Sequence, residues 1–302
     1  MTMKPIPVEI GSAFPKWRQA AWLLAPSFVF LFMFTYFPML SVLWDSLYSN
    51  AGLGKATQFV GLENYRDLFQ DDVFVTAFTN NVIYAFGTIF PSVVLALLFA
   101  LMLQASSRFN SLIRSILFFP TLVPLVAAAG LWMFIFLPSI GLLDFYLAKL
   151  GARSVNWIGD PDIALYALMV LTIWKNAGYF MLFFLAGLQG IPEDALEAAI
   201  LEGATPWQRM RYIILPLLKP TTSFVIVIAF IFSITQVDHL IVLTEGGPAN
   251  ATNLLLFYIF QNAHEFNNNA TASAATVISL VVLLAVSVLN IRTLERGTHY
   301  ES

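Results

Sequence analysis

The chain has 302 residues, of which 59% are hydrophobic and only 11% are charged. Soluble domains carry about 25% charged residues, so this composition indicates a protein whose main solvent is lipid. The net charge of −3 does not suggest that the protein binds nucleic acid. The absence of cysteine excludes disulfides, iron–sulfur clusters and thiol nucleophiles.

Six apolar runs are each long enough to cross a bilayer, which takes about 20 residues. They predict membrane helices at about 20–44, 81–104, 115–138, 164–188, 221–244 and 272–290, within a transmembrane domain at 19–296 and between polar tails at 1–18 and 297–302. The first run is longer than the apolar part of a signal peptide and shows no small-residue cleavage site, so we interpret it as a membrane helix bent at Pro26 or Pro38. Three prolines and a glycine predict that the third helix is bent or broken.

Basic residues predict the orientation of the six helices. If the N-terminus is inside, ten basic residues lie on the cytoplasmic side: Lys4, Lys16, Arg18, Arg108, Arg114, Arg209, Arg211, Lys219, Arg292 and Arg296. Only four then lie outside: Lys55, Arg66, Lys149 and Arg153. By the positive-inside rule this distribution favours both termini in the cytoplasm, with residues 191–220 on the same side.

Residues 191–220 form a polar island between two of the apolar runs, and the pattern predicts two short helices. Pro192 is suited to an opening turn, and Glu193 begins a group of acids near the positive end of the first helix. Gly203 is a plausible left-handed stop, and Thr205 is a plausible N-cap for the second helix, with Pro206 at its first position. The spacing also places one stripe on the first helix: Leu196, Ala199, Ile200 and Gly203.

The same island resembles the EAA loop of ABC importer permeases. The matching positions are Glu197, Ala198, Ala199, Gly203, Ile213, Leu215 and Pro216. In that family the loop is the coupling helix that docks in a groove of a cytoplasmic ATPase. The resemblance implies that Glu197 contacts a basic residue of the ATPase, and that the small residues allow close packing and the turn. The residues alone would indicate an exposed helical hairpin.

Two further strings resemble the carbohydrate-uptake group of these permeases. They are FVGLENY at 59–65 and TEGGP at 244–248. The plainer interpretation of the first string is a short amphipathic helix lying on the membrane. The resemblance implies a sugar or oligosaccharide as solute, with a polyol, a sugar phosphate or glycerol 3-phosphate as the alternative.

The resemblance implies an all-α, six-helix fold of the type I ABC importer class, with both termini inside. The chain would be half of a transporter in the bacterial cytoplasmic (inner) membrane, without catalytic residues or cofactor of its own. Its expected partners are a second, similar permease, two copies of an ABC ATPase that bind ATP and Mg, and a periplasmic or extracellular solute-binding protein.

Lys175 is the one charge deep in a predicted span, and there it should face protein or water. It is either a pathway residue, with Asn176 and Tyr179 beside it, or a structural group that pairs with an acid or caps carbonyls. The sequence leaves both interpretations open.

A second polar group lies near the outer end of the fifth predicted helix. Gln236 and Asp238 are candidates for substrate contact or gating, whereas His239 is expected to lie at the membrane interface. All three could instead reach headgroups or water. The three histidines, His239, His264 and His299, are too scattered to suggest a metal site.

The sequence contains no phosphate-binding loop, since Gly54-Lys55 is the only Gly-Lys pair and lacks the required glycine spacing.

Two other classes of protein, an intramembrane enzyme and a self-sufficient carrier, fit the sequence less well. An intramembrane enzyme would need paired acids, a metal set or a Ser/His pair within the spans. A self-sufficient carrier would usually show repeats or broken helices that hold ions, and the EAA loop would have no purpose in it.

Overall fold

The computed structural model describes residues 16–50 and 57–295. These ranges are built from helices, apart from an isolated bridge between Tyr48 and Phe59. The tail predicted at 297–302 and most of the tail at 1–18 lie outside the described residues, as do Lys4, Lys55, Arg296 and His299.

Five helical segments of the described chain are long and apolar enough to cross a membrane, and a bent pair is a sixth candidate. They are α1 (Lys16–Leu31) continued by the π-turn Phe32–Tyr36 and α2 (Phe37–Asp45), α4 (Asp72–Leu103), the bent pair α5 (Arg108–Leu122) and α6 (Leu125–Phe136), α8 (Ala164–Gln189), α12 (Lys219–Thr235) with α13 (Asp238–Leu243), and α15 (Asn269–Glu295). The described chain thus has the all-helical, polytopic architecture that the sequence predicts.

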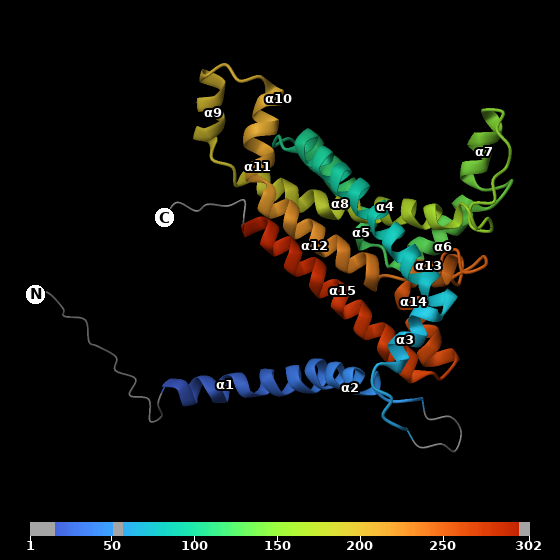
Figure 1. Cartoon of the computed structure of the whole chain (residues 1–302). Coiled ribbons are helices and arrows are strands. Elements are labelled where there is room, and N and C mark those ends of the chain that lie inside the picture. The colour runs from blue at the N-terminus through green and yellow to red at the C-terminus, as the bar shows by residue number, and fades with distance from the viewer. Residues whose placement is uncertain (1–15, 51–56, 296–302) are drawn as a thin grey trace, which may run out of the picture.

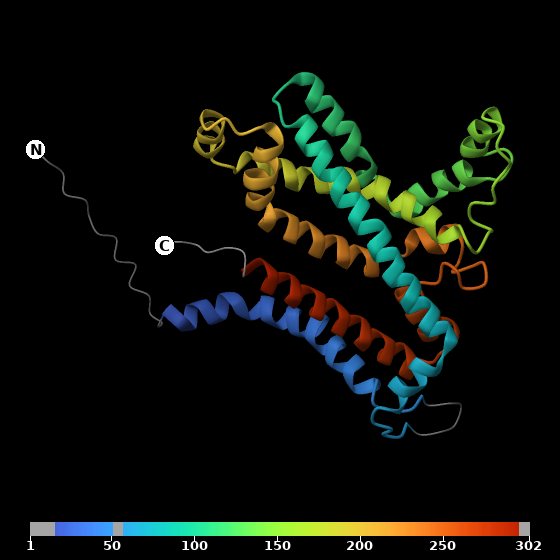
Figure 2. The same ribbon diagram turned by 45° about the horizontal axis from the view of Figure 1, so that its top comes forward.

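Short elements gather at the two ends of the long helices (Figures 1 and 2). One end carries α9 (Glu193–Leu201), α10 (Pro206–Arg209), a π-turn (Met210–Ile214) and α11 (Leu215–Leu217). The opposite end carries α3 (Glu63–Gln70), α7 (Leu142–Lys149), α14 (Leu255–Phe260) and a π-turn (Gln261–Glu265).

The second membrane helix begins nine residues earlier than the predicted start at 81. The Asp71 carboxylate accepts a hydrogen bond from the main-chain N–H of Val73 at 2.9 Å, so it caps α4 at Asp72. The polar first turns of α4 are kept helical by packing against α3, α14 and the loop before α14, and this tertiary support is not visible in an apolarity pattern.

Two predicted helices are broken in the structure. The segment predicted at 115–138 consists of α5 and α6, bent by 101° at the extended Val123 and at Pro124, which has no N–H to continue a helix. The segment predicted at 221–244 is interrupted at the extended Gln236, a break that no proline or glycine announces. In the first span the irregular turn directly precedes Pro38, whereas Pro26 lies inside regular helix.

The buried core is centred on α4 and α8, which pack along each other. At the end that bears α3, α7 and α14 it includes Tyr84, Leu168, Leu171, Leu240 and Leu254 from α4, α8, α13 and the segment before α14. Towards α9 it continues with buried side chains of α4, α8 and α12: Ala96, Ala100, Phe180, Phe184, Val225 and Ala229. The first span contributes no buried residue over its apolar window, although α2 packs against α15.

The segment around α3 is integrated into the protein rather than lying free on a membrane surface. The Asn64 amide donates to the carbonyls of Ser46 and Tyr48 at 2.8 and 2.9 Å, and the Tyr65 hydroxyl donates to Ser46 at 2.7 Å. Leu68 is fully buried against α4 and α15. These contacts tie the C-terminal end of the first span to the core.

Candidate functional site

Residues 191–220 form a helical hairpin at one end of the molecule (Figure 1). Gly203 closes α9 in a left-handed conformation with φ +78°, as predicted. Thr205 and Gln208 cap α10 reciprocally: the Thr205 N–H donates to the Gln208 side chain at 2.7 Å, and the Gln208 N–H donates to the Thr205 hydroxyl at 3.3 Å. The sequence thus encodes both ends of the turn locally.

The two later prolines of the island lie near the starts of helices. Pro216 and Pro220 are the second residues of α11 and α12. A proline is well tolerated there because the first N–H groups of a helix have no intrahelical acceptor. The hairpin therefore continues into the fifth membrane helix with only a brief irregularity at Leu218.

The candidate coupling residues do not all face the same way. Glu193, Glu197 and Ala198 are exposed on α9, whereas Ala199 is buried inside the hairpin. Ile213 and Leu215 are half-buried, and Pro216 is exposed. The predicted stripe is thus split, since Ala199 packs inwards while Ile200 faces solvent.

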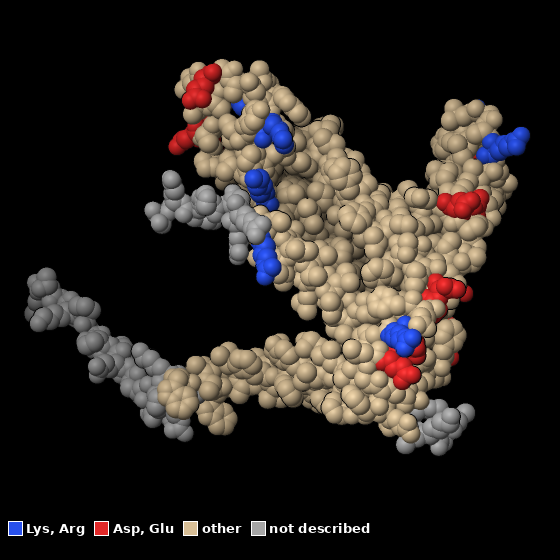
Figure 3. Space-filling model, in the orientation of Figure 1, with Lys and Arg blue, Asp and Glu red and all other residues tan. Residues whose placement is uncertain are grey.

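The surface of the hairpin combines charge with unpartnered apolar side chains. The large exposed ones are Ile200, Leu201, Trp207, Tyr212 and Leu217. A cleft of about 360 Å³ opens between the two arms and is lined by residues that include Ala199, Gly203 and Ile213. Figure 3 shows acidic side chains at the free end of the hairpin and basic ones beside them. Such a surface suits a protein partner.

Lys175 lies where α8 crosses the break between α5 and α6. Its ammonium group donates to the carbonyls of Pro120, Thr121 and Val123 at 3.1, 3.4 and 2.5 Å, and the Thr121 hydroxyl donates back to the Lys175 carbonyl at 3.1 Å. Only 8% of the residue is exposed. The Pro120 carbonyl also accepts from the Val123 N–H at 3.3 Å, and Lys175 supplies a further donor to the carbonyls around the bend, so it caps them. Of the two interpretations left open, carbonyl capping describes these contacts, and the pathway role stays a prediction.

The other pathway candidates lie on α8 and at the break of the fifth span. Asn176 is buried on α8, and Tyr179 packs its ring against Phe232 of α12 at 6.0 Å. Gln236 follows one turn later, with its N–H donating to the Phe232 carbonyl, and Asp238 is exposed at the start of α13. Phe232 thus links Tyr179 and Gln236, whereas Lys175 is directed to α5.

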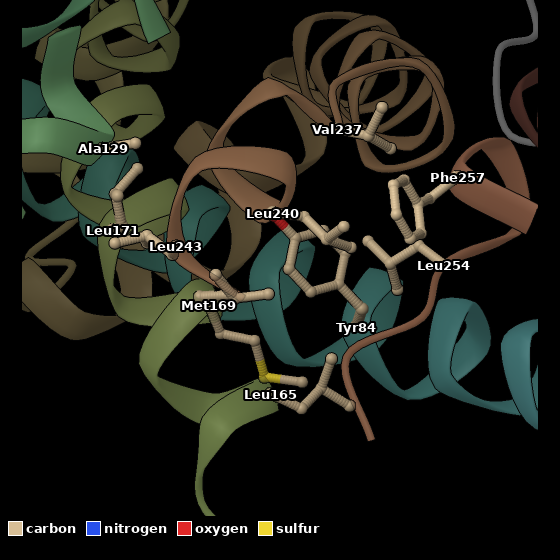
Figure 4. Close-up of a cluster of buried hydrophobic side chains, with 11 residues drawn as sticks. Tyr84, Ala129, Leu165, Met169, Leu171, Val237, Leu240, Leu243, Leu254 and Phe257 are labelled. Atoms are coloured by element: carbon tan, nitrogen blue, oxygen red, sulfur yellow. The ribbon is translucent and has the colours of Figure 1, made fainter. Parts of the chain in front are cut away.

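The expectation that His239 lies at the membrane interface is wrong. Its side chain is 1% exposed, and its Nε2 lies 2.8 Å from the Tyr84 hydroxyl, which in turn lies 2.5 Å from the Thr172 hydroxyl. The break at Gln236 turns α13 back over the core, so that its histidine points inwards. Figure 4 shows Tyr84 surrounded by Leu240, Leu254 and other apolar side chains.

Two asparagines that sequence reasoning missed hold the loop that contains TEGGP. The Asn80 side-chain amide donates to the main-chain carbonyls of Asn250 and Asn253 at 2.9 and 3.1 Å. The side-chain oxygen of Asn81 accepts from the main-chain N–H of Leu255 at 3.3 Å. The signal that the sequence offered for these contacts was the pair of adjacent asparagines at the start of an apolar run. The loop is therefore fixed to α4.

The described ranges contain no group of three or more histidine and acidic side chains that could hold a metal ion.

The profile of the family described as "Binding-protein-dependent transport system inner membrane component" matches residues 92–300, which is more than half of the chain. The chain belongs to this family. It is therefore a permease subunit of an ABC importer, a multi-pass, non-catalytic membrane component.

Two relatives and one solved structure resemble the permease over nearly its whole length. The sn-glycerol-3-phosphate transport system permease protein UgpA of Yersinia pestis is 31% identical over 92% of this chain and 95% of UgpA. The trehalose/maltose transport system permease protein MalF of Thermococcus litoralis is 30% identical over 89% of this chain and 91% of MalF. A chain of a bacterial alginate ABC transporter, crystallised with an alginate pentasaccharide-bound periplasmic protein, matches with a TM-score of 0.78 at 24% identity, over 91% of this chain and 92% of that chain. The permease thus has the fold of type I ABC importer permeases.

Proposed function

We propose that this permease forms half of the translocation pathway for a neutral sugar or oligosaccharide. The trehalose/maltose relative supports a sugar. A phosphate-bearing solute would call for cationic donors in the pathway, and the one cation deep in the spans, Lys175, already donates to three main-chain carbonyls. The choice of a neutral solute rests on these three hydrogen bonds of Lys175.

The second candidate solute is glycerol 3-phosphate, a sugar phosphate or a polyol, and the relationship to UgpA favours it. Glycerol 3-phosphate and sugar phosphates are anionic whereas sugars and polyols are neutral, so the assay below includes a polyol as a separate solute. The permease is reconstituted with its partners, and ATP hydrolysis is measured with each solute in turn. We expect neutral sugars to stimulate hydrolysis. Stimulation by glycerol 3-phosphate alone would replace the first candidate by the second.

We propose that the 191–220 hairpin couples the permease to a cytoplasmic ABC ATPase. The exposed Glu197 would contact a basic residue of the ATPase, and the exposed Ala198 would permit close approach. Ile200, Leu201 and Trp207 offer apolar surface for the same contact. Ala199 and Gly203 would act indirectly, because they shape the hairpin itself.

The complete importer would contain a second, similar permease, two ATPase copies that bind ATP and Mg, and an external solute-binding protein. It would lie in the bacterial cytoplasmic membrane with both termini of this chain inside. Closure of the ATPases on ATP would push the hairpins and turn the pathway outwards. A self-sufficient carrier is disfavoured, since it would leave the apolar and acidic hairpin surface without a partner.

A further inference from the structure

The arm around α7, residues 138–157, has an inverted distribution of polarity. Its one acid, Asp144, points inwards and is only 3% exposed. The Asp144 carboxylate accepts hydrogen bonds from the Ser139 N–H at 2.7 Å, from the Trp157 indole at 2.9 Å, and from the Ser154 hydroxyl and the Val155 N–H. The interior of the arm is therefore polar, and its carboxylate has hydrogen-bond donors on both oxygens.

The outward face of the same arm is apolar. Ile140 and Leu150 are 80% and 82% exposed, and Phe145 and Tyr146 are half exposed or more. The Lys149 ammonium lies over the Phe145 ring, 4.4 Å from its centroid. A helix in water places its acid outside and its aromatic rings inside, so this arrangement indicates that the surroundings of α7 are less polar than its own interior.

The position of the arm identifies those surroundings. It begins directly after α6 and ends a few residues before α8, so it connects the ends of two candidate spans. The exposed apolar side chains continue from the arm onto these helices, with Leu131 and Phe134 on α6 and Tyr166 on α8. In Figures 1 and 2 the arm lies crosswise to α8, as a helix lying in a membrane surface would.

The chemistry of the outward face fits a lipid headgroup region. Aromatic rings and aliphatic side chains with neighbouring cations are typical of segments at the boundary between acyl chains and headgroups. Lys149 and Arg153 are the cations here, and Figure 3 shows basic side chains at the tip of the arm. Lipid phosphates carry the complementary charge.

We propose that residues 140–153 form an interfacial lipid anchor on the outer side of the membrane. The apolar face of α7 lies at the boundary of headgroups and acyl chains, and Lys149 and Arg153 contact lipid phosphates. The anchor fixes the outer end of the bent α5–α6 pair against the bilayer. The inference does not depend on the identity of the solute.

The absence of cysteine allows a direct test in the full importer complex. Tyr146→Cys carries an environment-sensitive fluorophore in nanodiscs of phosphatidylethanolamine and phosphatidylglycerol, with Leu150→Cys as a second site. Asp162→Cys, an exposed position in the same connection, is the matched control. Quenching is measured with acrylamide in water and with lipids brominated near the headgroup end of their chains.

We expect brominated lipid to quench the labels at 146 and 150, with acrylamide quenching several-fold weaker than at 162. Equal acrylamide quenching at all three sites would overturn the proposal, because the arm would then lie in water. Protection from both quenchers would also overturn it, because a protein surface would then cover the face. Lys149→Gln with Arg153→Gln is expected to raise acrylamide quenching at 146, and an unchanged value would remove the phosphate contact from the proposal.

Discussion

Buried polar side chains join the pieces of this permease where its helices break. Lys175 bridges the end of α5 and the start of α6 through three carbonyls, and the Tyr84, Thr172 and His239 group joins α4, α8 and α13. The side chains of each group are almost fully buried, so a lost partner leaves the others without their hydrogen bonds. Removing one member should therefore be costly.

Lys175→Met should destabilise the complex by about 1–3 kcal/mol, because the carbonyls at the break lose their donor. Lys175→Arg should retain part of this stability, since it keeps a buried donor. Thermal unfolding of the purified complex measures both effects. Lys219→Met, at an exposed position, is the control. An unaltered melting temperature for Lys175→Met with lost uptake would instead indicate a solute contact.

Tyr84→Phe should also destabilise the permease by about 1–3 kcal/mol, because Thr172 and His239 lose the hydroxyl between them. The matched control is Tyr166→Phe, on an exposed tyrosine of α8. Denaturant or thermal unfolding in detergent provides the measurement. Equal stability of the two variants would show that the hydrogen bonds of Tyr84 contribute nothing.

At the scale of single elements, what the sequence predicts depends on how local the cause is. The apolar runs, the Gly203 turn and the Thr205 cap follow from neighbouring residues, and the structure has all of them. The inward turn of α13 depends on packing against α6 and on the contacts of His239 with Tyr84 and Thr172, all far away in sequence, so the position of His239 was predicted wrongly. The carbonyls capped by Lys175 lie more than 50 residues before it, so spacing could not choose between its two roles.

Ala198→Trp should abolish transport and solute-stimulated ATP hydrolysis while leaving the fold intact. Ala198 is exposed on α9, so the large ring would block docking of a partner without crowding the hairpin. Ala199→Trp should also lower the melting temperature, because Ala199 is buried. Ala105→Trp, exposed at the same end of the molecule, is the control for uptake and assembly. Normal transport by the Ala198→Trp complex would contradict the coupling role.

The arm around α7 should loosen in acid. The Ser154 hydroxyl and the Ser139 N–H, with Trp157 and Val155, lower the pKa of Asp144 to about 2 from its ordinary value of 3.8. A lowered pKa means that the stabilisation is fully present above the ordinary pKa and is lost as the pH falls through about 2. A fluorophore at position 146 should therefore report a transition between these values. Asp144→Asn should remove the transition, and its persistence would assign it to another group.

At the scale of the whole molecule, the two ends of the permease are built differently. One end bears the 191–220 hairpin, whose apolar and acidic surface lacks a partner in the isolated chain. The other end bears α3, α7 and the loop tied to Asn80, which contact the ends of the spans there. Rigid connections between the ends would let a push at the hairpin move the pathway.

The most direct test of this account is uptake of radiolabelled sugar into proteoliposomes that contain both permeases and the external binding protein, with and without the ATPase. We expect accumulation only when the ATPase and ATP are present, and none with Ala198→Trp. Accumulation against a gradient by the permease without any ATPase would contradict it.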